Sequence, residues 1–181
     1  MKLTTRGRYA VTAMLDLALH AGTGPVSLSD IAGRQAISLS YLEQLFAKLK
    51  RASLVSSSRG PGGGYLPARA LDAMSVADIV DAVDERIDAT RCGGHGNCQD
   101  GETCLTHQLW AELSQRIHDY LSSISLASLA ERQHVQQVAH RLEQRRLVGH
   151  GEVDAARTGE GLRPEVGGAL AGERLIDTLS L

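Results

Sequence analysis

The sequence has few aromatic residues, few cysteines and no long apolar run. Only 3% of its 181 residues are aromatic, so a core must be built mainly from Leu, Ile, Val and Ala, a composition that favours helices. Its three cysteines are too few, and odd in number, for a disulfide-stabilised secreted domain. No run approaches the roughly 20 apolar residues of a membrane span, and Asp16 interrupts the apolar stretch after the basic N-terminus, unlike a signal peptide. We therefore expect a cytoplasmic protein with no membrane partner.

Charge is distributed unevenly along the chain. The net charge is -2, but residues 1–69 contain nine basic and three acidic residues, a net charge of +6, which leaves -8 for the other 112 residues. This asymmetry is typical of a basic module that binds a polyanion, joined to an acidic part with another role.

Three helices are predicted in the basic part. Thr4 or Thr5, Ser27 and Ser38 can each cap a helix N-terminus. The apolar residues of the third helix all lie within about 120° of one another around the helix axis, and the opposite face is polar and basic. Its expected buried residues are Leu39, Leu42, Leu45, Phe46 and Leu49. Two short helices joined by a tight turn match a helix-turn-helix, although an ordinary helical hairpin with a solvated face fits this segment as well.

The residues after the third helix favour the helix-turn-helix. Residues 54–59 are typical of a strand, residues 60–64 of a turn, and residues 65–66 of a returning strand, which together predict the wing of a winged helix. The glycine run lacks the Lys-Ser/Thr of a P-loop, and Tyr65 replaces the third glycine of a dinucleotide site. We therefore predict that residues 1–69 form a winged helix-turn-helix domain that binds double-stranded DNA operator sites.

The predicted DNA contacts lie on the outer face of the third helix and on the wing. They are Ser40, Glu43, Gln44, Arg51, Arg59, Gly60 and Gly62. Gln44 can form two hydrogen bonds with adenine, whereas Glu43 can only accept one from a donor such as the cytosine amino group. Arg51 and Arg59 are expected at phosphates or in the minor groove, and the glycines allow positive φ and a close approach to DNA.

The acidic part is predicted to contain a short helix, a long helix and a tail. Residues 70–89 are expected to form a connecting helix, and residues 105–130 a dimerisation helix with an apolar stripe too long for a wing domain to cover. The expected homodimer interface consists of Leu109, Leu113, Ile117 and Leu121. Residues 131–181 have little apolar content and are predicted to be a disordered tail. The expected fold class is therefore mainly α with a small β wing.

All three cysteines lie in the glycine-rich segment 90–107. Cys92, Cys98 and Cys104 are separated by five residues each, and His107 follows Cys104 by three. Clustering in a poorly apolar loop favours a metal centre over inert core thiols. If Cys104 and His107 both lie on the first turn of the long helix, they share a face. Zinc ligands are usually closer together, so gaps of five suit an iron-sulfur cluster better, although the spacing leaves the metal open. His95 competes with His107 as a ligand, but a solvated loop histidine is its expected role.

Several segments resemble the iron-sulfur cluster regulators of the Rrf-type winged-helix transcription factor family. They are residues 1–11, 37–46 and 59–65, and the loop from 89–92 through 104–107; the resemblance covers the chain from residue 1 to about residue 130. It implies that Cys92, Cys98, Cys104 and His107 ligate one 2Fe-2S cluster, and that a homodimer controls genes for cluster assembly. Cluster-donating assembly proteins are then possible partners.

Three alternatives stay open beside this resemblance. A nitric-oxide-sensing winged-helix repressor has a similar wing and three cysteines, but the ending Cys104-Leu-Thr-His107 favours the cluster regulators. The loop could also hold a structural zinc ion or a redox-enzyme centre. No Cys-x-x-Cys redox pair and no substrate-pocket signature occurs in the sequence, so an enzyme is not expected.

Overall fold

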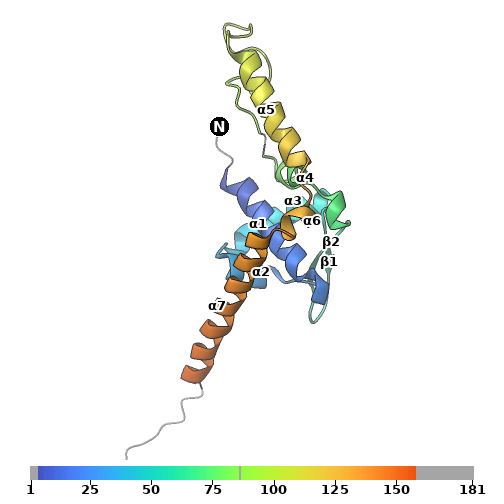
Figure 1. The fold of residues 1–181 in the computed structure, drawn as a ribbon, viewed down its shortest axis with the longest axis vertical. Helices are drawn as coiled ribbons and strands as arrows, with labels where there is room; N and C mark the ends of the chain where they lie inside the picture. The colour runs from blue at the N-terminus through green and yellow to red at the C-terminus, as the bar shows by residue number, and fades with distance from the viewer. Residues whose placement is uncertain (1–3, 86, 158–181) are drawn as a thin grey trace, which may run out of the picture.

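The computed structural model describes residues 4–85 and 87–157. Its elements are α1 (Thr5–His20), η1 (Ala21–Thr23), α2 (Leu28–Gln35), α3 (Leu39–Arg51), β1 (Val55–Ser58), β2 (Gly64–Pro67), η2 (Leu71–Ala73), α4 (Val76–Ala82), α5 (His107–Ser122), α6 (Leu126–Ala130) and α7 (Gln133–Arg157). In Figure 1, α1 to α4, α6 and the two strands form a central body, from which α5 extends in one direction and α7 in the other. The mainly α fold with a small β wing is as predicted.

The predicted starts of the first three helices are confirmed. Thr4 caps α1 by accepting a hydrogen bond from the Arg6 amide at 3.2 Å, and Ser27 caps α2 by accepting one from the Asp30 amide at 3.1 Å. Ser38 occupies the N-cap position of α3 without a hydrogen bond from its side chain. Between α2 and α3 the chain turns at Ala36, whose φ of 52° lies in the left-handed region.

One core joins α1, α3 and α4. Leu42, Leu45, Phe46 and Leu49 of α3 are buried as predicted. Leu39 is 44% exposed, so the prediction that it is buried is wrong. The reason is that Ile37, two residues earlier in the turn, is only 5% exposed and takes the core position at this end of the helix.

The predicted wing is present as an antiparallel hairpin. Its register pairs Val55 with Pro67 and Ser58 with Gly64. Gly60 and Gly62, at φ values of 106° and 74°, supply the positive-φ positions of the turn. Tyr65 holds the hairpin on the body: it exchanges two backbone hydrogen bonds with Val26, at 2.9 and 2.8 Å, and its ring packs on the edge of Phe46 with centroids 4.8 Å apart.

The helices expected to connect and to dimerise differ from the prediction. The connecting segment 70–89 is part of the body, because Met74, Ile79 and Val83 lie in the same core as α1 and α3. The long helix is not continuous over 105–130: α5 ends at Ser122, and Ser125 caps a new helix, α6. Leu126, which is fully buried, then inserts into the core. Its amide donates to the Met74 carbonyl at 2.8 Å and so fixes the base of α5 to the body.

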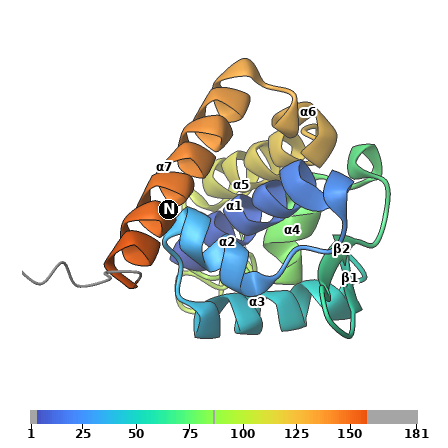
Figure 2. The same ribbon diagram turned by 90° about the horizontal axis from the view of Figure 1, so that it is seen from below.

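The prediction of a disordered tail from residue 131 is wrong for the segment that forms α7. Its Val135, Val138 and Leu142 recur at helical spacing and, with Leu15 and Leu19 of α1, line a cavity of about 230 Å³. The residues between these apolar positions have high helix propensity, so the segment forms a helix, and the apolar positions give it one side that faces α1. Figure 2 shows α7 beside α1 and α2. The rest of the predicted tail, residues 158–181, lies outside the described residues.

Two carboxylates are buried in the body. Asp16 is 2% exposed and accepts hydrogen bonds from Arg34 Nη2 at 2.6 Å and from Gln35 Nε2 at 2.6 Å. Glu85 is 6% exposed and accepts hydrogen bonds from the Thr4 amide, the Thr4 hydroxyl and the Gly7 amide. Arg34, one of the nine basic residues of segment 1–69, therefore pairs with a buried carboxylate and stabilises the fold. No described helix is both long and apolar enough to cross a membrane.

Candidate metal centre and nucleic-acid interface

The loop between α4 and α5 closes on itself through local hydrogen bonds. Asp88 accepts hydrogen bonds from the amide and the hydroxyl of Thr90, both at 2.6 Å, and the Thr90 hydroxyl in turn accepts one from the Gly94 amide at 2.7 Å. Gly93, Gly94, Gly96 and Gly101 all have positive φ, which allows tight reversals of the chain. These reversals bring the cysteines together. Sequence reasoning missed the roles of Asp88 and Thr90, although Asp two residues before Thr is typical of an Asx turn.

Three of the four predicted ligands form a group. The ligand atoms of Cys92, Cys98 and His107 all lie within 4.8 Å of one another. The Nδ1 atom of His107 is 3.4 Å from Cys92 Sγ and 3.7 Å from Cys98 Sγ. All three residues are partly buried, and His107 is the first residue of α5. The loop and α5 project from the body together and are called the α5 arm below. The tip of this arm thus carries thiols and an imidazole at the mutual distances that a metal centre requires.

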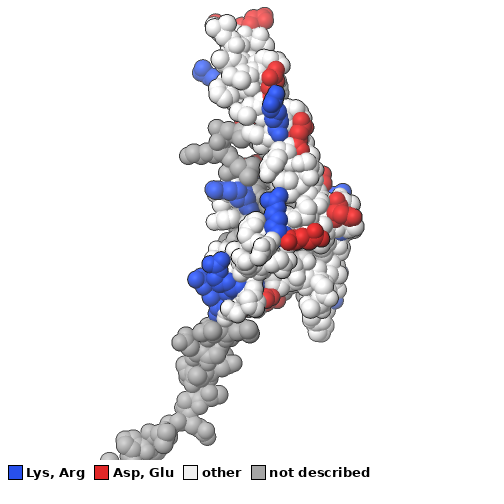
Figure 3. Space-filling model, viewed as in Figure 1, with Lys and Arg blue, Asp and Glu red and all other residues white. Residues whose placement is uncertain are grey.

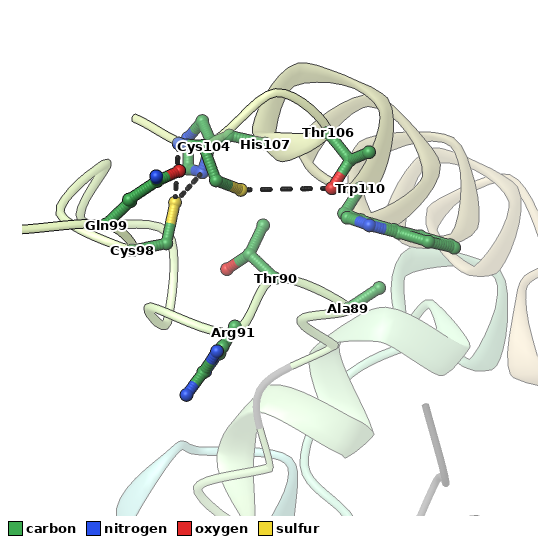
Figure 4. A pocket seen from close by; sticks show the side chains of 9 residues that line it. All are labelled: Ala89, Thr90, Arg91, Cys98, Gln99, Cys104, Thr106, His107 and Trp110. Atoms are coloured by element: carbon green, nitrogen blue, oxygen red, sulfur yellow. Dashed lines mark hydrogen bonds between the residues drawn. The ribbon is translucent and has the colours of Figure 1, made fainter. Parts of the chain in front are cut away.

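Cys104, the fourth predicted ligand, is adjacent to this group but not part of it. Its amide donates to Cys98 Sγ at 3.1 Å, while its own Sγ lies 3.8 Å from Thr106 Oγ1; Figure 4 shows these contacts. The idea that Cys104 and His107 share the first turn of the helix is wrong, because α5 begins at His107 with Thr106 as its N-cap residue. His95 is exposed and lies outside the group, in keeping with a solvated loop residue.

The surroundings of the thiols change their acidity. Burial favours the neutral thiol of Cys92, but hydrogen bonds, among them those from the Gly96 and Asn97 amides, outweigh it and lower its pKa to about 6. The pKa of Cys104 is lowered as well, first by a hydrogen bond from the Cys98 thiol. For Cys98 the Cys104 amide favours the thiolate, but the hydrogen bond to the Cys104 thiolate and burial together raise the pKa. Two of the three thiols therefore ionise more readily than a free cysteine, as metal ligation requires.

A cavity of about 410 Å³ opens beside these ligands. It is lined by Ala89, Thr90, Arg91, Cys98, Gln99, Cys104, Thr106, His107 and Trp110, and Figure 4 shows Arg91 at one side and Trp110 at another. Thiolates are soft ligands and imidazole binds zinc and iron well, so this set suits zinc and iron-sulfur centres. The cavity provides room next to Cys98, Cys104 and His107 for a group larger than one ion. The residues present therefore fit a metal centre.

The predicted DNA-contacting residues all reach the surface of the body. Ser40, Glu43, Gln44 and Arg51 on α3 and Arg59, Gly60 and Gly62 on the wing are exposed. Figure 2 shows α3 and the wing along the same outer side of the body. Two further lysines of α3 have partners within the chain that the sequence did not reveal: Lys50 Nζ donates to Ser57 Oγ of the wing at 2.6 Å, and Lys48 Nζ donates to Asp84 Oδ2 at 2.8 Å.

α5 carries exposed apolar side chains that no other element of the described chain covers. None of its residues is buried; Leu109 is 59%, Leu113 38% and Tyr120 61% exposed, whereas Ile117 and Leu121 are partly buried. The helix rests on α4 near its base, where His118 Nε2 lies 3.1 Å from Asp81 Oδ2. In the view of Figure 3, acidic side chains follow one edge of the molecule from the tip of α5 to the body, with basic groups beside them.

Comparisons with known proteins agree with this arrangement. The profile of the Rrf2 family, described as an iron-dependent transcriptional regulator, matches residues 3–132. The HTH-type transcriptional regulator IscR of Erwinia tasmaniensis is 59% identical over 141 residues, which cover 78% of this chain and 86% of that protein. The structure of T. potens IscR is similar with a TM-score of 0.59 and 40% identity, over 71% of this chain and 85% of that one. CymR, the global cysteine regulator of B. subtilis, gives a TM-score of 0.62 and 35% identity, over 72% and 96%.

Proposed function

Because the chain belongs to the Rrf2 family of transcriptional regulators and is thus a DNA-binding regulator and not an enzyme, we propose that it senses iron-sulfur cluster status through the loop between α4 and α5. The observation that carries the proposal is the group formed by Cys92, Cys98 and His107, with Cys104 beside it. The name of the Erwinia relative, an IscR protein, supports it. The regulated genes would be those for cluster assembly, with assembly proteins that donate clusters as partners.

In this proposal the four side chains hold a 2Fe-2S cluster. Cys92, Cys98 and Cys104 would supply thiolates, and His107 a neutral imidazole from the start of α5. The bound cluster would supply a redox-active group sensitive to iron and oxidants. An imidazole in place of one thiolate leaves the site less negative, which raises the potential and weakens retention compared with four thiolates. A loosely held cluster suits a sensor, because its loss can report shortage or damage.

We place the regulator on DNA as a homodimer. The exposed apolar stripe of α5, which includes Leu109, Leu113, Ile117 and Leu121, would be covered by the same helix of a second copy, since a two-fold interface uses one patch twice. Two winged helices joined in this way read two half-sites at a set spacing. The loop lies between the body and the tip of α5, so a change in its order can alter that spacing.

The proposed DNA contacts separate into two kinds that mutation can distinguish. Arg51 and Arg59 would meet phosphates, so Arg59→Ala should weaken binding to all sequences and reduce the salt dependence of the binding constant by about one unit. Glu43 carries a negative charge that phosphate repels, so Glu43→Ala should relax sequence discrimination more than it lowers affinity. Unchanged discrimination in Glu43→Ala, together with an unchanged salt slope in Arg59→Ala, would place the DNA surface elsewhere.

The cluster proposal is tested by purifying the full chain without oxygen. We expect about two iron and two sulfide per chain and the visible absorbance of a 2Fe-2S centre. Replacing Cys92, Cys98 or Cys104 singly with Ala should abolish that absorbance, and His107→Cys should retain it at a lower potential. His95→Ala is the matched control, since this exposed histidine lies in the same loop, and its spectrum should equal the wild type.

Two results would contradict the cluster proposal. The first is a wild-type protein that contains stoichiometric zinc without iron or sulfide, which would make the centre structural. The second is equal affinity of cluster-bearing and cluster-free dimers for every promoter tested, which would separate the metal from regulation.

A further inference from the structure

Asp84 is an acidic residue beside α3, the helix proposed to read DNA and here called the recognition helix. It follows the end of α4, and its carboxylate Oδ2 accepts a hydrogen bond from Lys48 Nζ of α3 at 2.8 Å. The Asp84 side chain is 74% exposed and that of Lys48 25% exposed. Lys48 lies on the flank of the α3 face that carries Gln44 and Arg51. This ion pair therefore borders the surface proposed to meet DNA.

The backbone around Asp84 is held in place by its neighbours. Asp84 has a φ of 57°, a left-handed conformation that terminates helices and that Asp and Asn tolerate better than most residues. Its amide donates to the Asp81 carbonyl at 3.0 Å. The next residue, Glu85, is buried and accepts hydrogen bonds from Thr4 and Gly7 in the first turn of α1. The backbone of Asp84 is thus held between α1 and α3, while its side chain is exposed.

Other basic groups surround the same carboxylate. The pKa of Asp84 is lowered, first by its hydrogen bond from Lys48 and the charge of Lys48, and further by the charges of Arg51 and Arg6. Arg6 also donates a hydrogen bond to the Val83 carbonyl at 3.5 Å. An acidic group thus lies among cations on two helices of the basic module.

We propose that Lys48 is a phosphate-binding residue of the recognition helix and that Asp84 masks it. With the ion pair intact, the ammonium group of Lys48 is neutralised within the chain and releases no counterion when DNA binds. When the pair opens, Lys48 can turn to a phosphate at the border of the α3 face. Asp84 is then a positioning residue that limits the number of phosphate contacts.

The position of the mask connects it with the loop. Residues 83–85 are the last part of the body before the segment that carries the cysteines, and residue 87 already lines a groove against α5. A shift of that segment would reach Asp84 only through Glu85, which is anchored to α1. The loop is therefore joined to the carboxylate that faces Lys48 through one anchored residue.

The proposal rests on the DNA-binding role of α3 given above and is independent of the metal. It is tested by measuring operator affinity against salt concentration for the full-length protein as purified. Asp84→Asn keeps the shape of the side chain and the left-handed backbone but removes the charge. We expect a binding constant about two- to fivefold higher, the scale of an exposed ion pair, and a salt slope steeper by about 0.9, the value for one added phosphate contact.

Two further variants separate masking from a general loss of negative charge. Asp72→Asn removes the same charge from an exposed residue of η2 and should leave the slope unchanged. Adding Lys48→Met to Asp84→Asn should cancel the gain in slope, and Lys48→Met should reduce the slope more in that background than in the wild type. Thermal unfolding of each variant verifies that the body remains folded.

Each outcome decides the proposal. Equal slopes for Asp84→Asn and Asp72→Asn, or an equal effect of Lys48→Met in both backgrounds, overturn the mask. Arg51→Met, measured in parallel, shows whether α3 is the DNA surface: a shallower slope in Arg51→Met with no change in Asp84→Asn rejects the mask alone. No change in either variant rejects both the mask and the proposed DNA surface.

Discussion

The winged-helix body and the α5 arm differ in how they are stabilised. Core residues of the body such as Met14, Phe46 and Ile79 are fully buried, and the buried carboxylates Asp16 and Glu85 have several hydrogen-bond donors each. The arm has no buried residue in α5, and its loop is held by short-range hydrogen bonds among exposed turns. The core of the body thus lies within one chain, whereas the apolar side chains of α5 are left exposed by the described part of the chain. Sensing is expected in such a region, because parts with few buried contacts respond most readily to a ligand.

The sharpest test of this difference is to place charges on the arm. Leu113→Lys combined with Ile117→Lys should abolish the dimer, because burying unpaired ammonium groups in an apolar interface is strongly unfavourable. Sedimentation should then report monomers or insoluble chain. Gln108→Lys with Gln115→Lys adds equal charge to the opposite face of α5 and should leave the dimer intact. A dimer of unchanged mass in the Leu113/Ile117 variant would show that another surface pairs the copies.

In the body, the largest expected loss follows from opening the buried ion pair. Arg34→Met leaves Asp16, 2% exposed, without its guanidinium partner, which should cost about 3–5 kcal/mol of unfolding free energy. Denaturant unfolding measures this loss. Replacing both residues, Asp16→Leu with Arg34→Met, should recover most of it, because no charge then stays buried. If the double variant is as unstable as the single one, the packing of these side chains matters more than their charges.

At the junction of body and arm, Glu85 should make stability depend on pH. Burial raises the pKa of Glu85, but the hydrogen bonds from Thr4 and Gly7 outweigh it and hold the pKa below its ordinary value of 4.5. A carboxyl group with a lowered folded-state pKa stabilises the fold above the unfolded value, and this contribution disappears as pH falls through the folded value. Stability should therefore fall below about pH 4.5 in the wild type.

Glu85→Gln is the matching variant for this pH dependence. It should lose about 1–3 kcal/mol at neutral pH, the range for hydrogen bonds to a charged group, and its stability should change less between pH 5 and about 3 than that of the wild type. Unfolding curves at several pH values measure both effects. Parallel curves for the two proteins would assign the acid sensitivity to another carboxyl group.

The smallest effect compares two helical glycines. A Cβ at Gly7 would lie 2.9 Å from Glu85 Oε2, whereas a Cβ at Gly33 in α2 would meet nothing within 4 Å. Gly33→Ala should therefore stabilise the fold by about 0.5–1 kcal/mol, the usual gain in a helix. Gly7→Ala should lose this gain and cost about 1 kcal/mol, since the carboxylate is held by three donors and cannot easily move. A similar gain at both sites would mean that Glu85 adjusts freely.

Local patterns in the sequence determined most of the secondary structure of the body and the set of cysteine and histidine residues in the loop. Capping by Thr4 and Ser27, the apolar face of α3 from Leu42 to Leu49, and the glycine turn of the wing depend on residues close together in the chain, so periodicity and capping predict them. The cysteine cluster was visible for the same reason. α7 was missed although its stripe of Val135, Val138 and Leu142 follows the same rule, because three apolar residues in a polar segment are a weak signal until α1 supplies a surface for them.

Contacts between distant residues were decided by the tertiary structure alone. Glu85 with Thr4, Lys48 with Asp84 and Arg34 with Asp16 are separated by 81, 36 and 18 positions, and nothing local marks one of these residues as the partner of another. The break of the long helix at Ser122, and the return of Leu126 to the core, likewise depend on the distant core residues against which Leu126 packs. Short-range capping and periodicity act within a few residues, but burial and charge pairing act between any groups that the folded chain brings together, so only the fold decides them.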